Sequence, residues 1–339
     1  MAPARAQIAT VVRNALLRPG PDPTYADGDD ATWMSVDWPS LQRTLEIGGQ
    51  RLNVLDTGSP QTSSSAGTGA DPPVLLFLHG WSSNWQVFLL NIAAFMDTHR
   101  VVAPDLPGFG ASDLPRETLS IQGYARTVDA LCDALGVERV AVVGNSMGGF
   151  IGAELALSFA TRVDRLVLVS AAGLSTERLP RGPSLAAARV VAAGTPYARR
   201  VESQVVRRPR LRRAAMQWVL RYPERLSVPL AEELVLSFGK PGFVAGLQAI
   251  MDYSYRERLP EIEIPVLIVW GRNDMLVPVA DAFAYAELIG DNARVEVFED
   301  TGHTPMVERP SRFNALLRGF LAGEAAPEAD VAGVTGSEA

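Results

Sequence analysis

Short apolar runs alternate with segments of helical periodicity along most of the chain. The apolar runs, rich in Val, Leu and Ile, occupy residues 74–80, 100–105, 140–144, 165–170, 266–271 and 294–300. The helical segments occupy residues 84–96, 121–135, 147–159, 279–289 and 310–321. Strands that alternate with helices form a parallel sheet covered by helices on both faces, so the pattern predicts a doubly wound α/β fold.

The remaining segments interrupt or extend this pattern. Residues 41–56 read as two short strands around Gly48-Gly49, a turn that tolerates positive φ. The alternation stops over residues 173–260, where helical patterns rich in Arg and Pro predict an insertion in the sheet. The domain boundaries expected are an N-terminal extension at 1–40, a core at 41–172 and 261–322, a helical cap at 173–260 and a disordered tail at 323–339.

Two stretches in the first seventy residues lie outside the regular pattern. Residues 1–20 place apolar side chains at helical spacing with no acidic residue, which predicts an amphipathic helix that packs on the protein or docks on a membrane. Residues 62–70 are Ser, Gly, Ala and Thr, a composition typical of a flexible loop.

Composition indicates an ordinary globular protein. The chain has 339 residues, of which 47% are hydrophobic and 20% charged. Its longest apolar runs hold about five residues, far below the roughly twenty of a membrane span. No secretory h-region precedes the fold, so we expect a cytoplasmic protein. The single cysteine, Cys132, shares a helical face with Val128, Leu131 and Leu135 and is expected in the core.

The segment Gly144-Asn145-Ser146-Met147-Gly148 directly follows an apolar run and opens a helical one. In this context a Gly-x-Ser-x-Gly pattern forms a sharp turn that exposes the serine Oγ above the sheet. Glycine at both flanks, Gly144 and Gly148, allows neighbouring chain to pass close to the strained serine. Ser146 is therefore the predicted nucleophile.

A serine nucleophile needs a positioned base, and the chain has three histidines. His99 precedes its strand, whereas catalytic groups gather at the carboxyl ends of parallel strands. His79 lies in the turn that must supply a backbone donor and is expected to orient that turn. His303 is left as the base. Asp274, just past the strand at 266–271, is the carboxylate expected to hold its imidazole.

Attack on a carbonyl creates an oxyanion that backbone N–H groups can stabilise. We expect the donors to be the amides of Met147, at the start of a helix, and of Trp81, where Gly80 lets the chain turn. The Trp81 side chain either lines the pocket or packs against the core.

The strings HGW, APDLPGFGASD, VGNSMGG, VWGRNDMLVP and DTGHTPMVERP, in this order, resemble the α/β-hydrolase fold over residues 41–322. The resemblance implies a mostly parallel, eight-stranded sheet with a helical cap at 173–260. It also implies Ser146 as nucleophile, Asp274 as acid and His303 as base. Asp105, in the shared APDLPGFG motif, is expected to be structural.

The expected function is cleavage of a carboxylic ester through an acyl-enzyme intermediate. Relatives that open epoxides or displace halide have Asp where this chain has Ser146, which disfavours those reactions. The string GNSMGG is similar to hydrolases that cleave carbon–carbon bonds in ring-fission products, and this is the alternative. Those relatives commonly have Trp where this chain has Thr304, and a Gly-rich oxyanion turn where it has HGWSSNW. Cofactor-free haloperoxidase-like and lyase activities share the same triad.

Other classes of function are disfavoured. No Gly-x-Gly-x-x-Gly follows the first apolar run, and Lys240 is followed by Pro241 instead of the Ser or Thr of a phosphate loop. Three scattered histidines and one cysteine give no metal-ligand cluster, so neither metal nor cofactor is expected. A net charge of −7 disfavours nucleic acid as a partner. A non-enzymatic binding protein would normally have lost a triad residue.

Charge is unevenly distributed. Residues 173–260 contain 14 Arg and one Lys against six Glu and one Asp, a net +8 that leaves −15 on the rest of the chain. This basic cap either pairs with the acidic body, or docks on anionic lipid or attracts anionic acyl substrates. The cap residues that either line an acyl pocket or form the cap core are Trp218, Leu220, Phe238, Phe243 and Tyr253.

Overall fold

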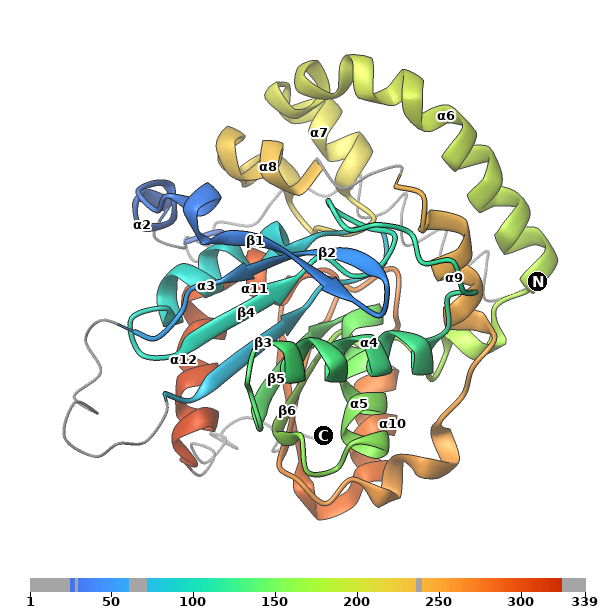
Figure 1. The fold of residues 1–339 in the computed structure, drawn as a ribbon. Helices are drawn as coiled ribbons and strands as arrows, with labels where there is room; N and C mark the ends of the chain where they lie inside the picture. Colours follow the sequence, from blue (N-terminus) through green and yellow to red (C-terminus); the bar gives the residue numbers. More distant parts are fainter. Residues whose placement is uncertain (1–24, 28–29, 61–71, 236–239, 325–339) are drawn as a thin grey trace, which may run out of the picture.

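The computed structural model describes residues 25–27, 30–60, 72–235 and 240–324. Its centre is one eight-stranded sheet in the order β1-β2-β4-β3-β5-β6-β7-β8 (Figure 1). The strands are β1 (Gln42–Ile47), β2 (Gln50–Asp56), β3 (Val74–Leu78), β4 (Arg100–Pro104), β5 (Val140–Asn145), β6 (Val163–Val169), β7 (Val266–Gly271) and β8 (Ala293–Phe298). The predicted fold class is therefore confirmed.

The pairing separates an antiparallel edge from a parallel body. β1 and β2 form a hairpin with Ile47 opposite Gln50, and Gly48 and Gly49 take φ values of 58° and 77° in its turn. β2 is antiparallel to β4, and every later pair is parallel. Because the six strands from β3 to β8 run the same way, the loops that follow them meet at one edge of the sheet.

Helices cover both faces of the sheet. On one face lie α4 (Ile121–Ala134), α5 (Met147–Ser158) and α10 (Ala280–Ile289), and on the other lie α3 (Leu89–Phe95), α11 (Pro305–Glu308) and α12 (Pro310–Ala322). Each face has its own apolar core. Cys132 lies in the first core, as expected, and burial raises the pKa of its thiol to about 12.

Between β6 and β7 the chain leaves the sheet, and we call residues 173–260 the insertion. Its helices are α6 (Arg181–Arg207), α7 (Pro209–Met216), α8 (Val228–Val235) and α9 (Phe243–Met251). In Figure 1, α6 arches along the outside of the molecule, and the other three lie between it and the sheet. Within the described ranges, no helix is both long enough and apolar enough to span a bilayer.

The helix expected over 84–96 is split, because a 3-10 turn, η3 (Trp85–Phe88), precedes α3. A short helix, α2 (Asp30–Met34), and further 3-10 turns were not expected: η1 (Trp38–Leu41), η4 (Thr176–Arg178), η5 (Pro223–Arg225), η6 (Arg256–Glu261) and η7 (Gly290–Asn292). The expectations for residues 1–20 and 62–70, and for all but the first two residues of the tail, lie outside the described residues.

Candidate functional site

Ser146 occupies the sharp turn between β5 and α5. Its φ of 55° and ψ of −117° are strained for a non-glycine residue. The flanking glycines make this turn possible, since a Cβ on Gly144 would lie 2.3 Å from the Gly148 carbonyl oxygen. A Cβ on Gly148 would lie 2.0 Å from the Leu78 carbonyl oxygen. The sequence expectation for both glycines therefore has a direct steric basis.

Ser146 lines a pocket of about 220 Å³ that the core and the insertion build together. The core supplies Asn145 from the end of β5 and, from the loops after β3, β5, β7 and β8, Gly80, Trp81, Ser82, Ser83, Ser146, Leu276, His303 and Thr304. The insertion supplies Met216, Val219, Leu220, Leu234 and Phe243, and η3 and α11 supply Val87 and Val307. Among the described residues that line the pocket, His303 alone has an ionisable side chain.

His303 follows β8 and lines the same pocket as Ser146. Its Nδ1 lies 2.7 Å from Oδ2 of Asp274, and both side chains are almost fully buried. The other Asp274 oxygen, Oδ1, accepts hydrogen bonds from the backbone N–H groups of Leu276 (2.8 Å) and Val277 (3.0 Å). The turn therefore fixes the Asp274 carboxylate through Oδ1. Its Oδ2 can hold Nδ1 of the His303 imidazole, which leaves Nε2 without a bond to Asp274.

The loop that contains His303 rests on a buried carboxylate, Glu308. Its oxygens accept hydrogen bonds from the N–H groups of Gly302 (2.9 and 3.0 Å) and Thr304 (3.3 Å), the two neighbours of His303. Burial raises the pKa of Glu308 to about 7, against these hydrogen bonds, which lower it. The sequence analysis did not single out Glu308, and its distance of five residues from His303 was the only available signal.

The insertion is attached to the same loop. The N–H of His303 donates to the carbonyl oxygen of Val219 (2.8 Å), and the N–H of Arg221 donates to Glu308 (2.8 Å). Tyr25, from the N-terminal extension, donates to Glu308 through its hydroxyl (2.9 Å), and that hydroxyl accepts from the N–H of Tyr222 (2.9 Å). Three distant parts of the chain therefore meet at Glu308.

The turn after β3 lies next to Ser146, since a Cβ on Gly80 would lie 3.1 Å from the Cβ of Ser146. His79 is buried in this turn. The N–H of Leu106 donates to its Nε2 (2.9 Å), so Nδ1 carries the proton and donates to the carbonyl of Gly80 (2.8 Å). Burial lowers the pKa of His79, which favours this neutral form.

Two backbone N–H groups are available near Ser146. Within the described part of the chain, the main-chain N–H groups of Trp81 and Met147 donate to no protein acceptor. The Trp81 side chain, expected either to line the pocket or to pack, does both. It lines the pocket, and its ring centroid lies 4.3 Å from that of Phe243. Its indole N–H donates to the Phe243 carbonyl (2.6 Å), which joins this turn to α9.

Asp105 lies in the loop after β4 and is buried. Its carboxylate accepts hydrogen bonds from Asn53 Nδ2 (2.9 Å) and from the N–H groups of Trp85 (3.1 Å) and Ala111 (2.8 Å). These contacts tie three segments together, in agreement with the structural role expected for Asp105.

The insertion residues named from the sequence agree with expectation only in part. Leu220 and Phe243 line the pocket, but Trp218 neither lines it nor joins a core, because 46% of its surface is exposed. Tyr253 donates to the buried Glu154 of α5 (2.7 Å), and Phe238 lies outside the described residues. Asn145, which the motif leaves unspecified, donates to the carbonyls of Val169 (3.1 Å) and His303 (3.3 Å).

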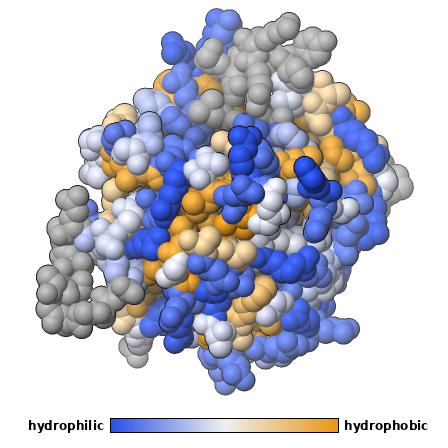
Figure 2. Space-filling model, in the orientation of Figure 1, coloured by the Kyte–Doolittle hydropathy of each residue, from blue (hydrophilic) through white to orange (hydrophobic). Residues whose placement is uncertain are grey.

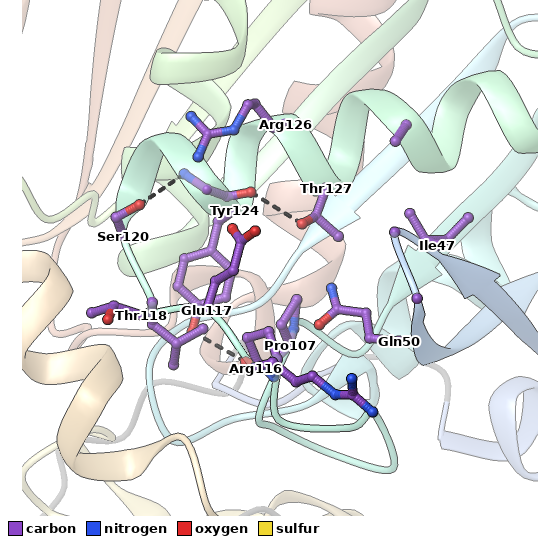
Figure 3. A pocket seen from close by; sticks show the side chains of 16 residues that line it. Ile47, Gln50, Pro107, Arg116, Glu117, Thr118, Ser120, Tyr124, Arg126 and Thr127 are labelled. Atoms are coloured by element: carbon purple, nitrogen blue, oxygen red, sulfur yellow. Dashed lines mark hydrogen bonds between the residues drawn. The ribbon is translucent and has the colours of Figure 1, made fainter.

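A larger hollow, of about 370 Å³, lies between the β1–β2 turn and the start of α4 (Figure 3). Its polar groups serve the helix itself, since Ser120 caps α4 by accepting from Gly123 N–H (3.0 Å) and Thr127 donates to the Gly123 carbonyl (3.0 Å). Tyr124 donates to the carbonyl of Pro107 (3.1 Å). Among the described residues that line this hollow there is no histidine and no serine in a strained turn, so the smaller pocket at Ser146 is the candidate site.

Comparisons with known proteins agree with this geometry. The family model described as "alpha/beta hydrolase fold" matches residues 73–310. A 2-hydroxy-6-oxononadienedioate/2-hydroxy-6-oxononatrienedioate hydrolase of Paraburkholderia phymatum is 33% identical over 286 residues, which cover 80% of this chain and 94% of the relative.

Two solved structures are each 26% identical to the chain. One is a membrane phospholipase A, described as a bacterial virulence factor (TM-score 0.61, covering 83% of this chain and 86% of that one). The other is Est816, described as an N-acyl homoserine lactone degrading enzyme (TM-score 0.64, covering 82% and 100%). With its sheet order, its strained serine turn and these matches, the chain belongs to the α/β-hydrolase fold family.

Proposed function

We propose that the protein is a serine hydrolase that cleaves a carboxylic ester with an uncharged, apolar acyl group. Ser146 attacks the carbonyl carbon, and His303 takes the proton of the hydroxyl and returns it to the leaving alcohol. Water then attacks the acyl-enzyme with His303 as base, which releases the acid and restores Ser146. Asp274 holds the His303 imidazole and stabilises its charged form.

The observation that carries this proposal is the 2.7 Å contact of His303 with Asp274 in a pocket that Ser146 also lines. A buried carboxylate on Nδ1 leaves Nε2 as the acceptor for a serine proton. The main-chain N–H groups of Trp81 and Met147 are the proposed oxyanion donors, and each such donor contributes about 10² to 10³ in rate.

The lining of the pocket favours an apolar acyl group over a charged substrate. The substrates in the name of the Paraburkholderia phymatum relative are dioates, which carry two carboxylates. A buried carboxylate needs a cationic partner or several hydrogen-bond donors. Apart from His303, the described lining of this pocket consists of hydroxyl, amide and apolar groups, which suits an ester with an aliphatic or aromatic acyl chain.

The same lining argues against anionic acyl substrates drawn in by the basic insertion. An apolar acyl chain can instead come from a lipid ester, and one structural neighbour is described as a membrane phospholipase A. We therefore propose that the insertion forms a cap over the pocket and sets the accepted acyl length. Peripheral contact with anionic lipid is a separate proposal.

The test is turnover of p-nitrophenyl esters of graded acyl length, measured beside a 2-hydroxy-6-oxo-dienoate ring-fission product. We expect ester turnover in the wild type and its loss in Ser146→Ala. Ser83→Ala is the matched control, because this serine lines the same pocket but does not lie in the strained turn. Turnover of the dienoate with none of any ester would replace the ester proposal by carbon–carbon bond hydrolysis.

A further inference from the structure

The outward face of α6 is apolar along half of the helix. The exposed residues Pro183, Ala186, Ala187, Val190, Val191 and Gly194 follow the spacing i, i+3, i+4, i+7, i+8 and i+11. This spacing places them on one face, which we call the α6 stripe. It extends over about 17 Å at roughly 1.5 Å per residue.

The α6 stripe is distinct from the packed side of the helix. Ala188 and Val206 are buried, and α6 contacts α7, α8 and α9. Val190 and Val191, by contrast, are 74% and 54% exposed. Figure 1 shows that α6 is the outermost helix of the insertion, and Figure 2 shows hydrophobic residues beside hydrophilic ones along that edge.

The surroundings of the α6 stripe are strongly basic. Residues 181–218 contain nine Arg and one Glu. Of these arginines, Arg181, Arg207 and Arg213 form ion pairs with Asp252, Glu232 and Glu224, and Arg212 is buried. Arg189, Arg208 and Arg210 are exposed, and none of them has an acidic partner among the described residues. A helix with an apolar face, basic residues at its flanks and few acidic ones is the pattern of helices that lie in the interface of an anionic membrane.

We propose that the α6 stripe docks on an anionic lipid surface, with its valines among the acyl chains and the neighbouring arginines at the headgroups. Charge selects this occupant. A second copy packed stripe against stripe would bring its own Arg189, Arg208 and Arg210 toward those of the first. Residues 1–20 of the same chain contain three arginines and no acidic residue, so they would add to the repulsion. Anionic headgroups would instead neutralise these arginines.

The direct test is co-sedimentation of the full chain with vesicles of phosphatidylcholine, with and without phosphatidylglycerol. We expect binding to the anionic vesicles that falls steeply between 50 and 500 mM salt, as surface electrostatics requires. We expect Val190→Asp with Val191→Asp to weaken binding at least tenfold. Phe283→Asp is the matched control, because Phe283 is 51% exposed on α10, at the opposite end of the molecule in Figure 1.

This proposal does not rest on the ester chemistry, since vesicle binding needs no turnover. Equal binding by the double variant and the wild type, or no binding at low salt, would overturn it. A dimer that the double variant dissociates, without vesicle binding, would assign the stripe to a second copy. A melting temperature lowered to the same extent by the double variant and by removal of residues 1–24, again without vesicle binding, would assign the stripe to those residues.

Discussion

The carbonyl oxygen of Val219, in the insertion, accepts a 2.8 Å hydrogen bond from the backbone N–H of His303. Close to it, the Arg221 N–H donates to Glu308, whose carboxylate also binds the N–H groups on either side of His303. The proposed base is therefore held by the insertion on one side and by a buried carboxylate on the other. The position of the insertion, which lines the pocket, is therefore linked to the position of the proposed base.

Replacement of the proposed triad acid should abolish most of the activity without loss of the fold. In Asp274→Asn, the side-chain carbonyl can keep the hydrogen bonds from Leu276 and Val277, but the imidazole loses its carboxylate. We expect kcat to fall by about 10⁴. Asp281→Asn is the control, because this buried carboxylate binds Ser175 N–H and lies outside the pocket. Similar losses in both variants would contradict the assignment.

The raised pKa of Glu308 gives stability a defined pH dependence. The folded pKa is about 7 against an ordinary value of 4.5, so the folded protein binds this proton more tightly than the unfolded chain. Protonation of Glu308 contributes roughly 3 kcal/mol to the free energy of unfolding. This contribution is complete below pH 4.5 and is lost as the pH rises through 7.

Glu308→Gln removes this titration. The amide also places an N–H₂ group among donors, so the variant should be less stable than the wild type at pH 5. As the pH rises to 8, the wild type alone loses the contribution of Glu308, and the difference should narrow. Urea unfolding of both proteins at pH 5, 6, 7 and 8 measures this difference in the free energy of unfolding. Parallel pH profiles for the two proteins would show that Glu308 does not titrate as described.

The glycine after the serine turn should tolerate no side chain. A Cβ on Gly148 would lie 2.0 Å from a backbone oxygen of β3, which no rotamer change relieves. We expect Gly148→Ala to lose at least about 3 kcal/mol or to fail to fold. Gly194→Ala, in α6 with nothing within 4 Å, should instead gain up to about 1 kcal/mol. Thermal unfolding compares the stability of the two variants. A Gly148→Ala variant as stable as the wild type would disprove the steric account.

The accepted acyl length should depend on α8. Leu234 lines the pocket, whereas its neighbour Val235 does not. We expect Leu234→Ala to move the optimum of kcat/KM toward longer p-nitrophenyl esters and Val235→Ala to leave it unchanged. A shift in both variants, or in neither, would mean that α8 does not set acyl length.

The sequence predicted the sheet and the candidate residues well where local chemistry determines them. The alternating apolar runs place the six strands from β3 to β8, and the pattern of residues 41–56 places the hairpin of β1 and β2. The glycines around Ser146 predict its turn because backbone strain and close approach require them. His303 and Asp274 follow from their places after β8 and β7, and the structure brings their side chains into contact.

Contacts that depend on the tertiary fold were not predictable in this way. Val219 acts through its carbonyl oxygen, which any residue supplies, so its identity carries no signal. Glu308 is a single acidic residue in a short helix, and its burial depends on the arrival of Tyr25 and Arg221 from distant segments. Trp218 was expected to line an acyl pocket or to form the cap core, yet it is half exposed and precedes the pocket residue Val219 in the chain.

The central claim is that Ser146 forms an acyl-enzyme. Its most direct test is intact-mass spectrometry of the protein, quenched in acid within the burst phase after mixing with a p-nitrophenyl ester. The account predicts an increase equal to one acyl group, located on the peptide that contains Ser146 and absent from Ser146→Ala. Ester turnover without any adduct, or an adduct on another residue that persists in Ser146→Ala, would contradict it.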